Sequence, residues 1–127
     1  SQNKITVKIK KKIICFDLDN VLCKTKSNNY ETSLPIKQNI FLVNKFFKDG
    51  FYIKIFTARY MGRNNDNVNK AKKQGYELTK TQLQKWKINY HELIFGKPSF
   101  DYYVDDKSIF YDKNWADIIK KKIYEKN

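Results

Sequence analysis

A short apolar segment, Ile13–Phe16, leads directly into two aspartates, Asp17 and Asp19, which are separated by one residue. A hydrophobic strand can carry charge at low cost only at its open end, where water, a metal ion or a ligand compensates the charge. Because successive side chains of a strand point to opposite sides, Asp17 and Asp19 lie on the same side of the chain. The segment therefore predicts a functional site at the carboxyl end of a strand in an open α/β sheet.

The length and composition are those of one globular domain, covering residues 1–127. Hydrophobic residues make up 41% of the sequence and aromatic residues 16%, which is more apolar than a disordered chain. No apolar stretch approaches the roughly 20 residues that span a bilayer. The basic start of the sequence lacks the apolar core of a signal peptide. We therefore expect a cytoplasmic protein without membrane contact.

The formal net charge of +13 raises the question of a nucleic-acid partner. The lysines are scattered, however, and Arg59 and Arg63 are the two arginines of the chain. Proteins that recognise phosphates and bases favour arginine forks, so a solvated basic surface is the preferred interpretation over a nucleic-acid groove. Such a surface would still attract a small phosphorylated substrate.

Two cysteines, Cys15 and Cys23, do not form the framework of a disulfide-stabilised protein. A catalytic thiol at Cys23 would need a nearby histidine, and His91 is far along the sequence. The acids are therefore better candidates for chemistry than the thiols.

Strands and helices are expected to alternate along the chain. Strands are expected at residues 4–9, 12–17, 51–56, 92–95 and 100–104. Helices are expected from Pro35 to a cap at Gly50, over residues 78–88 with Thr79 or Thr81 as the cap, and over residues 115–124 behind Asn114, with Ile118 and Ile119 inward. Residues 22–35, which we call the flap, and residues 61–70 are expected to be loops. This order predicts a mainly parallel sheet with helices on both faces.

Polar groups follow four of these strands. The carboxyl ends of parallel strands share one edge, and here they carry Asp17 with Asp19, Thr57, Lys97, and Asp105 with Asp106. A carboxylate can attack phosphorus and form an aspartyl-phosphate, while a second carboxyl group moves protons. A hydroxyl and an ammonium group can bind the phosphoryl oxygens, and further acids can hold Mg²⁺. Each strand end supplies one part of a phosphatase.

The four groups, in this order, resemble the motifs of phosphatases of the haloacid dehalogenase (HAD) superfamily. The motifs are Asp17-Leu18-Asp19-Asn20-Val21, Thr57 in Ile55-Phe56-Thr57-Ala58-Arg59, Lys97 in Phe95-Gly96-Lys97-Pro98, and Asp105-Asp106 in Tyr103-Val104-Asp105-Asp106-Lys107. The resemblance extends from about residue 12 to residue 107. It implies a three-layer, Rossmann-like (HAD-like) sheet.

By this resemblance, Asp17 is expected to be the nucleophile and an Mg²⁺ ligand. Asp19 is expected to be the general acid and base, with its backbone carbonyl on the metal, and its presence favours phosphatase over dehalogenase chemistry. Thr57 and Lys97 are expected to bind the phosphoryl group. Arg59 is a further candidate for substrate binding.

Asp105 and Asp106 are expected to complete the Mg²⁺ site, with Asp106 favoured for direct contact. The flap and residues 60–76 are too short for the cap domain of many relatives, so an uncapped enzyme is expected. Uncapped members act on large substrates or close the site with a neighbouring subunit, and a dimer or tetramer is a possible state.

Short strings around Thr57 and Lys97 are similar to small phosphatases of bacterial capsular polysaccharide biosynthesis. The expected substrate is thus a small phosphorylated metabolite, such as a sugar phosphate or an amino-alcohol phosphate. Two alternatives remain: a polynucleotide or protein phosphatase, and a noncatalytic nucleic-acid-binding module on the same fold.

Overall fold

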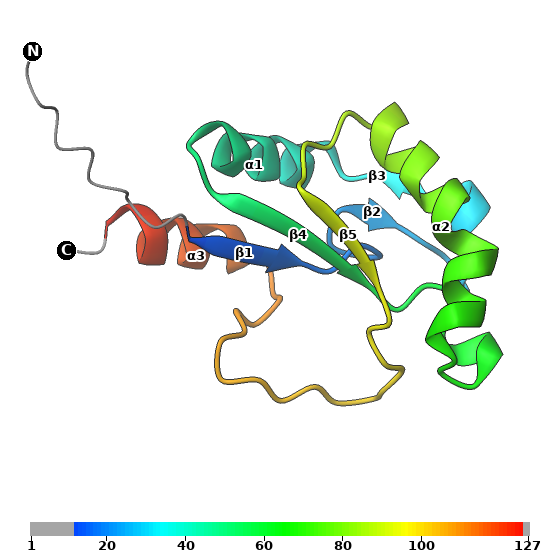
Figure 1. Ribbon diagram of the computed structural model, residues 1–127. Helices are drawn as coiled ribbons and strands as arrows, with labels where there is room; N and C mark the ends of the chain where they lie inside the picture. Colours follow the sequence, from blue (N-terminus) through cyan, green and yellow to red (C-terminus); the bar gives the residue numbers. More distant parts are fainter. Residues whose placement is uncertain (1–11, 126–127) are drawn as a thin grey trace, which may run out of the picture.

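The computed structural model describes residues 12–125, which are built around a parallel sheet (Figure 1). Its strands are β1 (Ile13–Phe16), β4 (Tyr52–Thr57) and β5 (Glu92–Phe95), in the spatial order β1-β4-β5. A separate antiparallel pair joins β2 (Cys23–Lys24) to β3 (Leu34–Pro35) within the flap. The helices are α1 (Lys37–Lys48), α2 (Val68–Lys85) and α3 (Trp115–Tyr124), and the short 3₁₀ turns are η1 (Tyr30–Thr32) and η2 (Gly62–Asn64).

The predicted α/β class is confirmed, because β1, α1, β4, α2 and β5 follow one another and all strand pairs of the main sheet are parallel. The three strands coincide with those predicted at residues 12–17, 51–56 and 92–95. No cap domain is inserted between the described elements. The strand expected at residues 4–9 lies outside the described part of the chain. None of the described helices combines the length and apolarity needed to cross a membrane.

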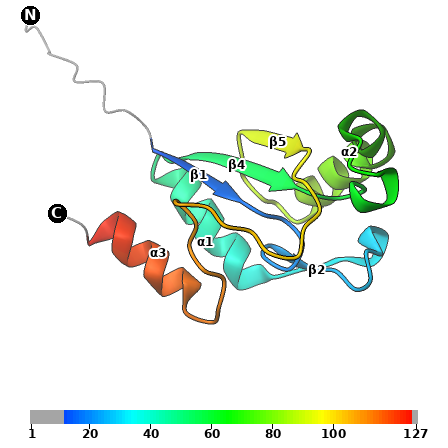
Figure 2. The ribbon, with the colours of Figure 1, turned by 90° about the horizontal axis from the view of Figure 1, so that it is seen from below.

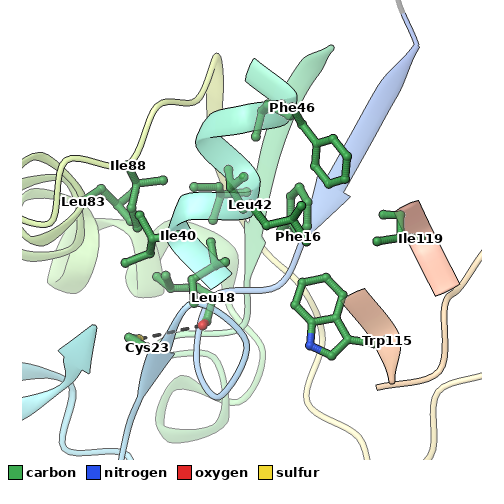
Figure 3. Packing of buried hydrophobic residues seen from close by; sticks show 14 residues of the cluster. Phe16, Leu18, Cys23, Ile40, Leu42, Phe46, Leu83, Ile88, Trp115 and Ile119 are labelled. Carbon is green, nitrogen blue, oxygen red and sulfur yellow. Dashed lines mark hydrogen bonds between the residues drawn. The ribbon is translucent and has the colours of Figure 1, made fainter. Parts of the chain in front are cut away.

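The hydrophobic core lies on one face of the sheet. Ile14 and Phe16 of β1 are in register with Ile53 and Ile55 of β4, so all four side chains point to the same side. The cluster they belong to includes side chains of all three helices: Ile40, Leu42, Val43 and Phe46 of α1, Leu83 of α2, and Trp115 and Ile119 of α3. Figure 3 shows Phe16 lying between Phe46 and Trp115, and its ring centroid is 6.4 Å from each of theirs.

The opposite face of the sheet is more open than the sequence suggested. Ile13 and Cys15 of β1 are exposed there, and Lys54 and Phe56 of β4 are half-buried. Phe95, whose partner in register is Thr57, lies on the core face, and Tyr76 of α2 packs against it. The described helices thus pack on the core face, and the second helical layer expected from the sequence is not seen among residues 12–125.

Helix α1 follows the expected pattern. Ile40, Val43 and Phe46 are buried at three-residue steps, and the chain leaves the helix through Gly50. Gly50 has a φ of +97°, a left-handed conformation that glycine adopts without the steric cost of a Cβ atom.

Helix α2 begins ten residues before the expected helix at 78–88, so the prediction of a loop over 61–70 is wrong for its last part. The side chain of Asn67 caps the helix by accepting a hydrogen bond from the Lys70 N–H at 3.0 Å. The buried positions of the first half include Ala71 and Gly75, followed by Thr79. These residues are small or polar, and a search for large apolar residues at helical spacing does not detect such a face.

The strand predicted at residues 100–104 is not formed, and the chain is irregular from Gly96 to Asn114. Tyr102 and Val104 are 91% and 98% exposed. Phe100 and Tyr103 stack on each other instead, with ring centroids 4.8 Å apart. Figure 2 shows this segment, in yellow to orange, as a long loop that passes β1 without pairing with it. Phe100 and Tyr103 thus pack on each other and do not contribute to a sheet.

Helix α3 matches its predicted range, but its details differ. Ile119 is buried as expected, whereas Ile118 is 37% exposed. Asn114 precedes the helix without a capping hydrogen bond from its side chain.

Candidate active site

Asp17 lies directly after β1, at the rim of a polar cavity. Its side chain is 35% exposed, and its Oδ1 accepts a hydrogen bond from the Leu18 N–H at 2.8 Å. Its Oδ2 lies 3.4 Å from Nζ of Lys97, the residue that follows the end of β5 by two positions. Burial raises the pKa of Asp17 above its ordinary value, although Lys97 acts in the opposite direction.

The segment after Asp17 turns sharply, which places Asp19 beside the same cavity. The Leu22 N–H bonds to the Leu18 carbonyl at 2.8 Å, and Asn20 has a φ of 67°, a conformation that asparagine tolerates better than most residues. Oδ1 of Asp19 accepts a hydrogen bond from the Thr25 hydroxyl at 2.6 Å. The acid is 20% exposed in its side chain, and the exposed part opens toward the cavity.

Thr57 and Lys97 come together through the backbone, as the parallel strands predict. The Lys97 N–H donates to the Thr57 carbonyl at 3.2 Å. The Thr57 side chain is completely buried, and its Oγ1 accepts a hydrogen bond from the Arg59 N–H at 3.1 Å. Lys97 lines the cavity, whereas Thr57 does not, although its neighbour Ala58 does.

Arg59 occupies a different place from the one expected of a substrate-binding residue. Its side chain has no exposed surface, and it does not line the cavity. The guanidinium group forms an ion pair with Asp19, with Nη2 at 2.9 Å from Oδ1. Tyr30 of the flap covers one face of this group, with its ring centroid 4.9 Å from Cζ.

Asp105 and Asp106 lie in the irregular loop after β5, and the structure does not bring them to Asp17. Both acids are exposed. Asp105 accepts hydrogen bonds from the Lys107 N–H at 2.9 Å and the Tyr103 hydroxyl at 3.2 Å, and the first of these is the main cause of its lowered pKa. Neither acid lines the cavity.

The arrangement does not fit a bound Mg²⁺. A magnesium site needs several oxygen ligands around one point. Between residues 12 and 125, no three acidic, histidine or cysteine side chains form a group suited to a metal ion. The oxygens of Asp19 already accept hydrogen bonds from Arg59 and Thr25, and one oxygen of Asp17 is paired with Lys97.

The cavity has a volume of about 390 Å³. Its charged groups are Asp17, Asp19 and Lys97, and the remaining polar lining consists of hydroxyl and amide groups. These come from Asn20, Thr25, Ser27 and Asn28 of the segment after β1 and from Ser99 of the loop after β5. The rings of Tyr30 and Phe100 complete the wall. The site suits a small polar molecule that carries one anionic group beside Lys97.

The thiols and the histidine do not form a second catalytic centre. Cys23 is fully buried, and burial together with the nearby charge of Asp19 raises the pKa of its thiol to about 11. His91 is stacked on Phe47 and on Tyr52, and its Nδ1 accepts a hydrogen bond from a β4 backbone N–H at 2.9 Å. The contacts of Cys23 and His91 therefore indicate a structural role for both residues.

The sequence matches no protein-family model, and it matches no curated protein. Among solved structures, it is similar to the crystal structure of an MCSG target protein from Vibrio cholerae, with a TM-score of 0.79. The two sequences are 27% identical, and the match covers 90% of this chain and 94% of the other. The α/β fold is thereby confirmed.

A second likeness is to a chain of the Pnkp1/Rnl/Hen1 complex, with a TM-score of 0.50 and 16% identity. This match covers 94% of the present chain and 36% of the larger one, and it concerns the fold alone.

The residues that sequence reasoning missed are those that surround Asp19. Thr25 and Ser33 of the flap and Gln82 of α2 all lie within one hydrogen-bonded network with Arg59. These residues are polar and stand far apart in the sequence, so no spacing rule links them. The one available signal is Arg59 itself, because a guanidinium group next to a buried strand requires several acceptors.

Proposed function

We propose that this protein hydrolyses phosphate monoesters and that the Asp17 carboxylate attacks phosphorus. The observation that carries the proposal is the 3.4 Å pair of Asp17 with Lys97 at a polar cavity, with Asp19 opening into the same cavity. Lys97 would attract the phosphoryl oxygens and bring the phosphorus atom to Asp17. The HAD-like α/β fold and the order of the motifs support this interpretation.

The reaction would proceed in two displacements. In the first, an Asp17 oxygen forms a bond to phosphorus, the bond to the alcohol oxygen breaks, and Asp19 in its protonated form gives a proton to that oxygen. In the second, water attacks the phosphorus of the aspartyl-phosphate, Asp19 takes a proton from the water, and Asp17 leaves as a carboxylate. The products are an alcohol and inorganic phosphate.

The lining of the cavity favours a small, hydroxyl-rich leaving group. Hydroxyl and amide side chains can donate to and accept from sugar hydroxyls. Among residues 12–125, Lys97 is the one basic side chain that lines the cavity, which suits one phosphate better than several. A sugar phosphate or an amino-alcohol phosphate is therefore the proposed substrate. Two further expectations remain predictions from the sequence. They are a role in surface polysaccharide synthesis and assembly into a dimer or tetramer.

Mg²⁺ also remains a prediction, since the described carboxylates do not form a set of ligands.

The test is phosphate release from an aryl phosphate by the wild type, by Asp17→Asn and by a control, Asp101→Asn. Asp101 is an exposed acid in the loop after β5, and it does not line the cavity. Asp17→Asn should reduce the rate by at least about 10³-fold, whereas Asp101→Asn should retain it. Borohydride reduction of the working enzyme should convert Asp17 to homoserine, which mass spectrometry detects. Full activity of Asp17→Asn would disprove the mechanism.

A substrate screen then separates the alternatives. It should include sugar phosphates, amino-alcohol phosphates, nucleotides, phosphopeptides and oligonucleotides with terminal phosphates. A clear preference for oligonucleotides, lost steeply with salt, would favour a polynucleotide phosphatase. Tight oligonucleotide binding with no phosphate release from any ester would favour a noncatalytic module.

A further inference from the structure

Arg59 carries a full charge at a place without solvent. Its side chain has no exposed surface, and every nitrogen of its guanidinium group has a partner. Nε lies 3.1 and 3.0 Å from the two oxygens of Asp19, and Nη2 lies 2.9 Å from Oδ1 of the same residue. This bidentate contact, in which Nε and Nη2 both bind the carboxylate, fixes the plane of the carboxylate as well as its position.

The guanidinium group also forms hydrogen bonds on the side that faces away from Asp19. Nη1 donates to the Thr79 hydroxyl at 3.2 Å and to Oε1 of Gln82, both on α2. Nη2 also donates to the Ser33 hydroxyl of the flap at 3.3 Å. Arg59 therefore joins α2 and the flap to Asp19, the acid that follows β1 by three positions.

The energetics show why this arrangement centres on Asp19. A buried guanidinium group is costly unless it is both paired with an opposite charge and fully hydrogen-bonded. In the ionised form that remains after it has given its proton to the leaving oxygen, Asp19 supplies the opposite charge, and the other described partners of Arg59 are neutral. The orientation of the acid is thus set by a network that reaches back to α2, together with the Thr25 hydroxyl at the cavity wall.

A direct contact between Arg59 and substrate is inconsistent with this geometry. The guanidinium group is outside the lining of the cavity, and Asp19 and Tyr30, which both contact it, stand at the cavity wall. A contact would require the ion pair to break and leave two charges without partners. Lys97 already provides the accessible cation.

We propose that Arg59 is a positioning residue, which holds the Asp19 carboxyl group in line with the leaving oxygen and couples this alignment to the flap and α2. The inference rests on the proposed phosphatase function. It predicts that loss of the arginine fork harms proton transfer more than phosphoryl binding. A lysine at this position keeps the positive charge but cannot form the bidentate contact with the carboxylate.

The test compares aryl and alkyl phosphates whose leaving groups differ in basicity. A weakly basic leaving group, such as 4-nitrophenolate, departs without a proton, whereas an alkoxide needs one from Asp19. For Arg59→Lys, the loss in kcat/KM should be at least tenfold greater for an alkyl phosphate than for 4-nitrophenyl phosphate. KM for 4-nitrophenyl phosphate should change little.

Two further variants keep the test decisive if Arg59→Lys folds poorly. Gln82→Met removes an acceptor of Nη1 at a residue that does not line the cavity, although it also removes the hydrogen bond from the Gln82 side chain to the Tyr30 carbonyl at 2.7 Å. It should give the same leaving-group dependence at smaller size. Arg63→Lys is the matched control, because Arg63 is an exposed arginine whose Cζ lies 5.3 Å from the ring centroid of Tyr30. It should change all substrates alike.

The results of these experiments separate the positioning role of Arg59 from the phosphatase function on which it depends. An equal loss across all leaving groups in Arg59→Lys and in Gln82→Met would overturn the positioning role and leave the phosphatase function intact. Absence of phosphate release by the wild type, or full activity of Asp17→Asn, would overturn the proposed function itself.

Discussion

Nζ of Lys97 lies 3.4 Å from Oδ2 of Asp17, and this contact joins the ends of two strands that are not neighbours in the sheet. The ammonium group also lies 5.5 and 5.2 Å from the ring centroids of Phe100 and Tyr103, so its position is defined from two sides. Only 14% of the lysine side chain is exposed, and the charge is therefore poorly screened. A phosphoryl group that enters the cavity would meet this charge beside the nucleophile.

Replacing Lys97 should therefore impair phosphoryl transfer strongly. Lys97→Met keeps most of the volume and removes the charge, and we expect kcat/KM to fall by about 10²- to 10³-fold, as for the loss of one charge-stabilising group. Steady-state kinetics with 4-nitrophenyl phosphate measures this change. Lys107→Met, in the same loop and exposed, serves as the control and should retain activity. Comparable losses in both variants would contradict a specific role for Lys97.

Removing Asp19 should destabilise the protein as well as slow it. Asp19→Ala leaves the Arg59 guanidinium buried without an opposite charge, and we expect a loss of about 3 kcal/mol in the free energy of unfolding. The matched control is Asp117→Ala, which breaks an exposed pair with Lys120 at 3.9 Å and should cost less than about 1 kcal/mol. Urea unfolding monitored by fluorescence gives both values. Equal stability of the two variants would show that Arg59 finds other compensation.

Gly75→Ala should destabilise α2 despite the higher helix propensity of alanine. A Cβ atom at this position would clash with Cδ2 and Cε2 of the Tyr60 ring. The Tyr60 ring is buried, and it packs against Tyr30 with centroids 4.8 Å apart, so it cannot move away cheaply. We expect a loss of about 1–3 kcal/mol from overpacking, against a gain of up to about 1 kcal/mol from propensity.

The companion change tests this cause. Gly75→Ala combined with Tyr60→Leu should lose less stability than the sum of the two single changes, because the clash is absent. Thermal unfolding of the four proteins completes the cycle. Strict additivity would indicate that the contact with Tyr60 is not the reason.

The stability contributed by the C-terminal helix should depend on pH. The Tyr124 hydroxyl donates to Oδ2 of Asp49 at 2.7 Å, which ties α3 to the end of α1. Burial and this hydrogen bond raise the pKa of Tyr124 to about 12, and the same bond is the main cause of the lowered pKa of Asp49. Raising the pKa of a phenol stabilises the fold below its unfolded pKa of about 10, and this stabilisation disappears as pH rises toward 12. Lowering the pKa of a carboxyl group stabilises the fold above about pH 4, and this contribution disappears at lower pH.

Tyr124→Phe should accordingly lower the Tm most between about pH 4 and 10, and the difference from the wild type should shrink on either side. Thermal unfolding followed by circular dichroism across this pH range and beyond both of its ends measures the effect. A difference that stays constant from pH 7 to pH 12 would exclude the hydrogen bond as its source.

The dependence on Mg²⁺ predicted from the sequence can be tested without assuming a geometry. If the expectation from the motifs holds, chelation of divalent cations abolishes phosphate release, added Mg²⁺ restores it, and Asp106→Asn raises the Mg²⁺ concentration needed for half-maximal activity, whereas Asp101→Asn in the same loop does not. If the arrangement of residues 12–125 is that of the working site, phosphate release survives chelation and both variants behave alike. Activity that survives chelation would mean that Asp17 and Lys97 act without a metal.

The sheet was predictable because its strands are short apolar runs that end in polar residues. Ile53 and Ile55 are buried at alternate positions, and the pattern ends at Thr57, where β4 ends. The first half of α2 was not predictable by the same means, since Ala71 and Gly75 bury backbone and small side chains rather than large apolar ones. Periodicity detects a hydrophobic face and misses one made of small residues.

The candidate site was predictable where one strand end decides the position. Asp17 and Lys97 meet because β1 and β5 are parallel and end at the same edge. The predicted position of Asp105 depended on a strand at residues 100–104. This strand is absent, because Phe100 and Tyr103 stack on each other and Tyr103 contacts Lys97. Arg59 shows the other limit: the sequence marks it as a charge, and only the fold reveals that this charge is buried.

The two thiols of the chain stand in opposite surroundings, and this difference offers a spectroscopic handle on the site. Cys15 is exposed on the open face of the sheet, two residues before Asp17, whereas Cys23 is enclosed beside Asp19. A thiol-reactive fluorophore should therefore attach to one defined position of the unmodified protein. Ligand binding at the cavity could then be followed by the emission of a dye anchored on the strand that carries the nucleophile, with no cysteine added or removed.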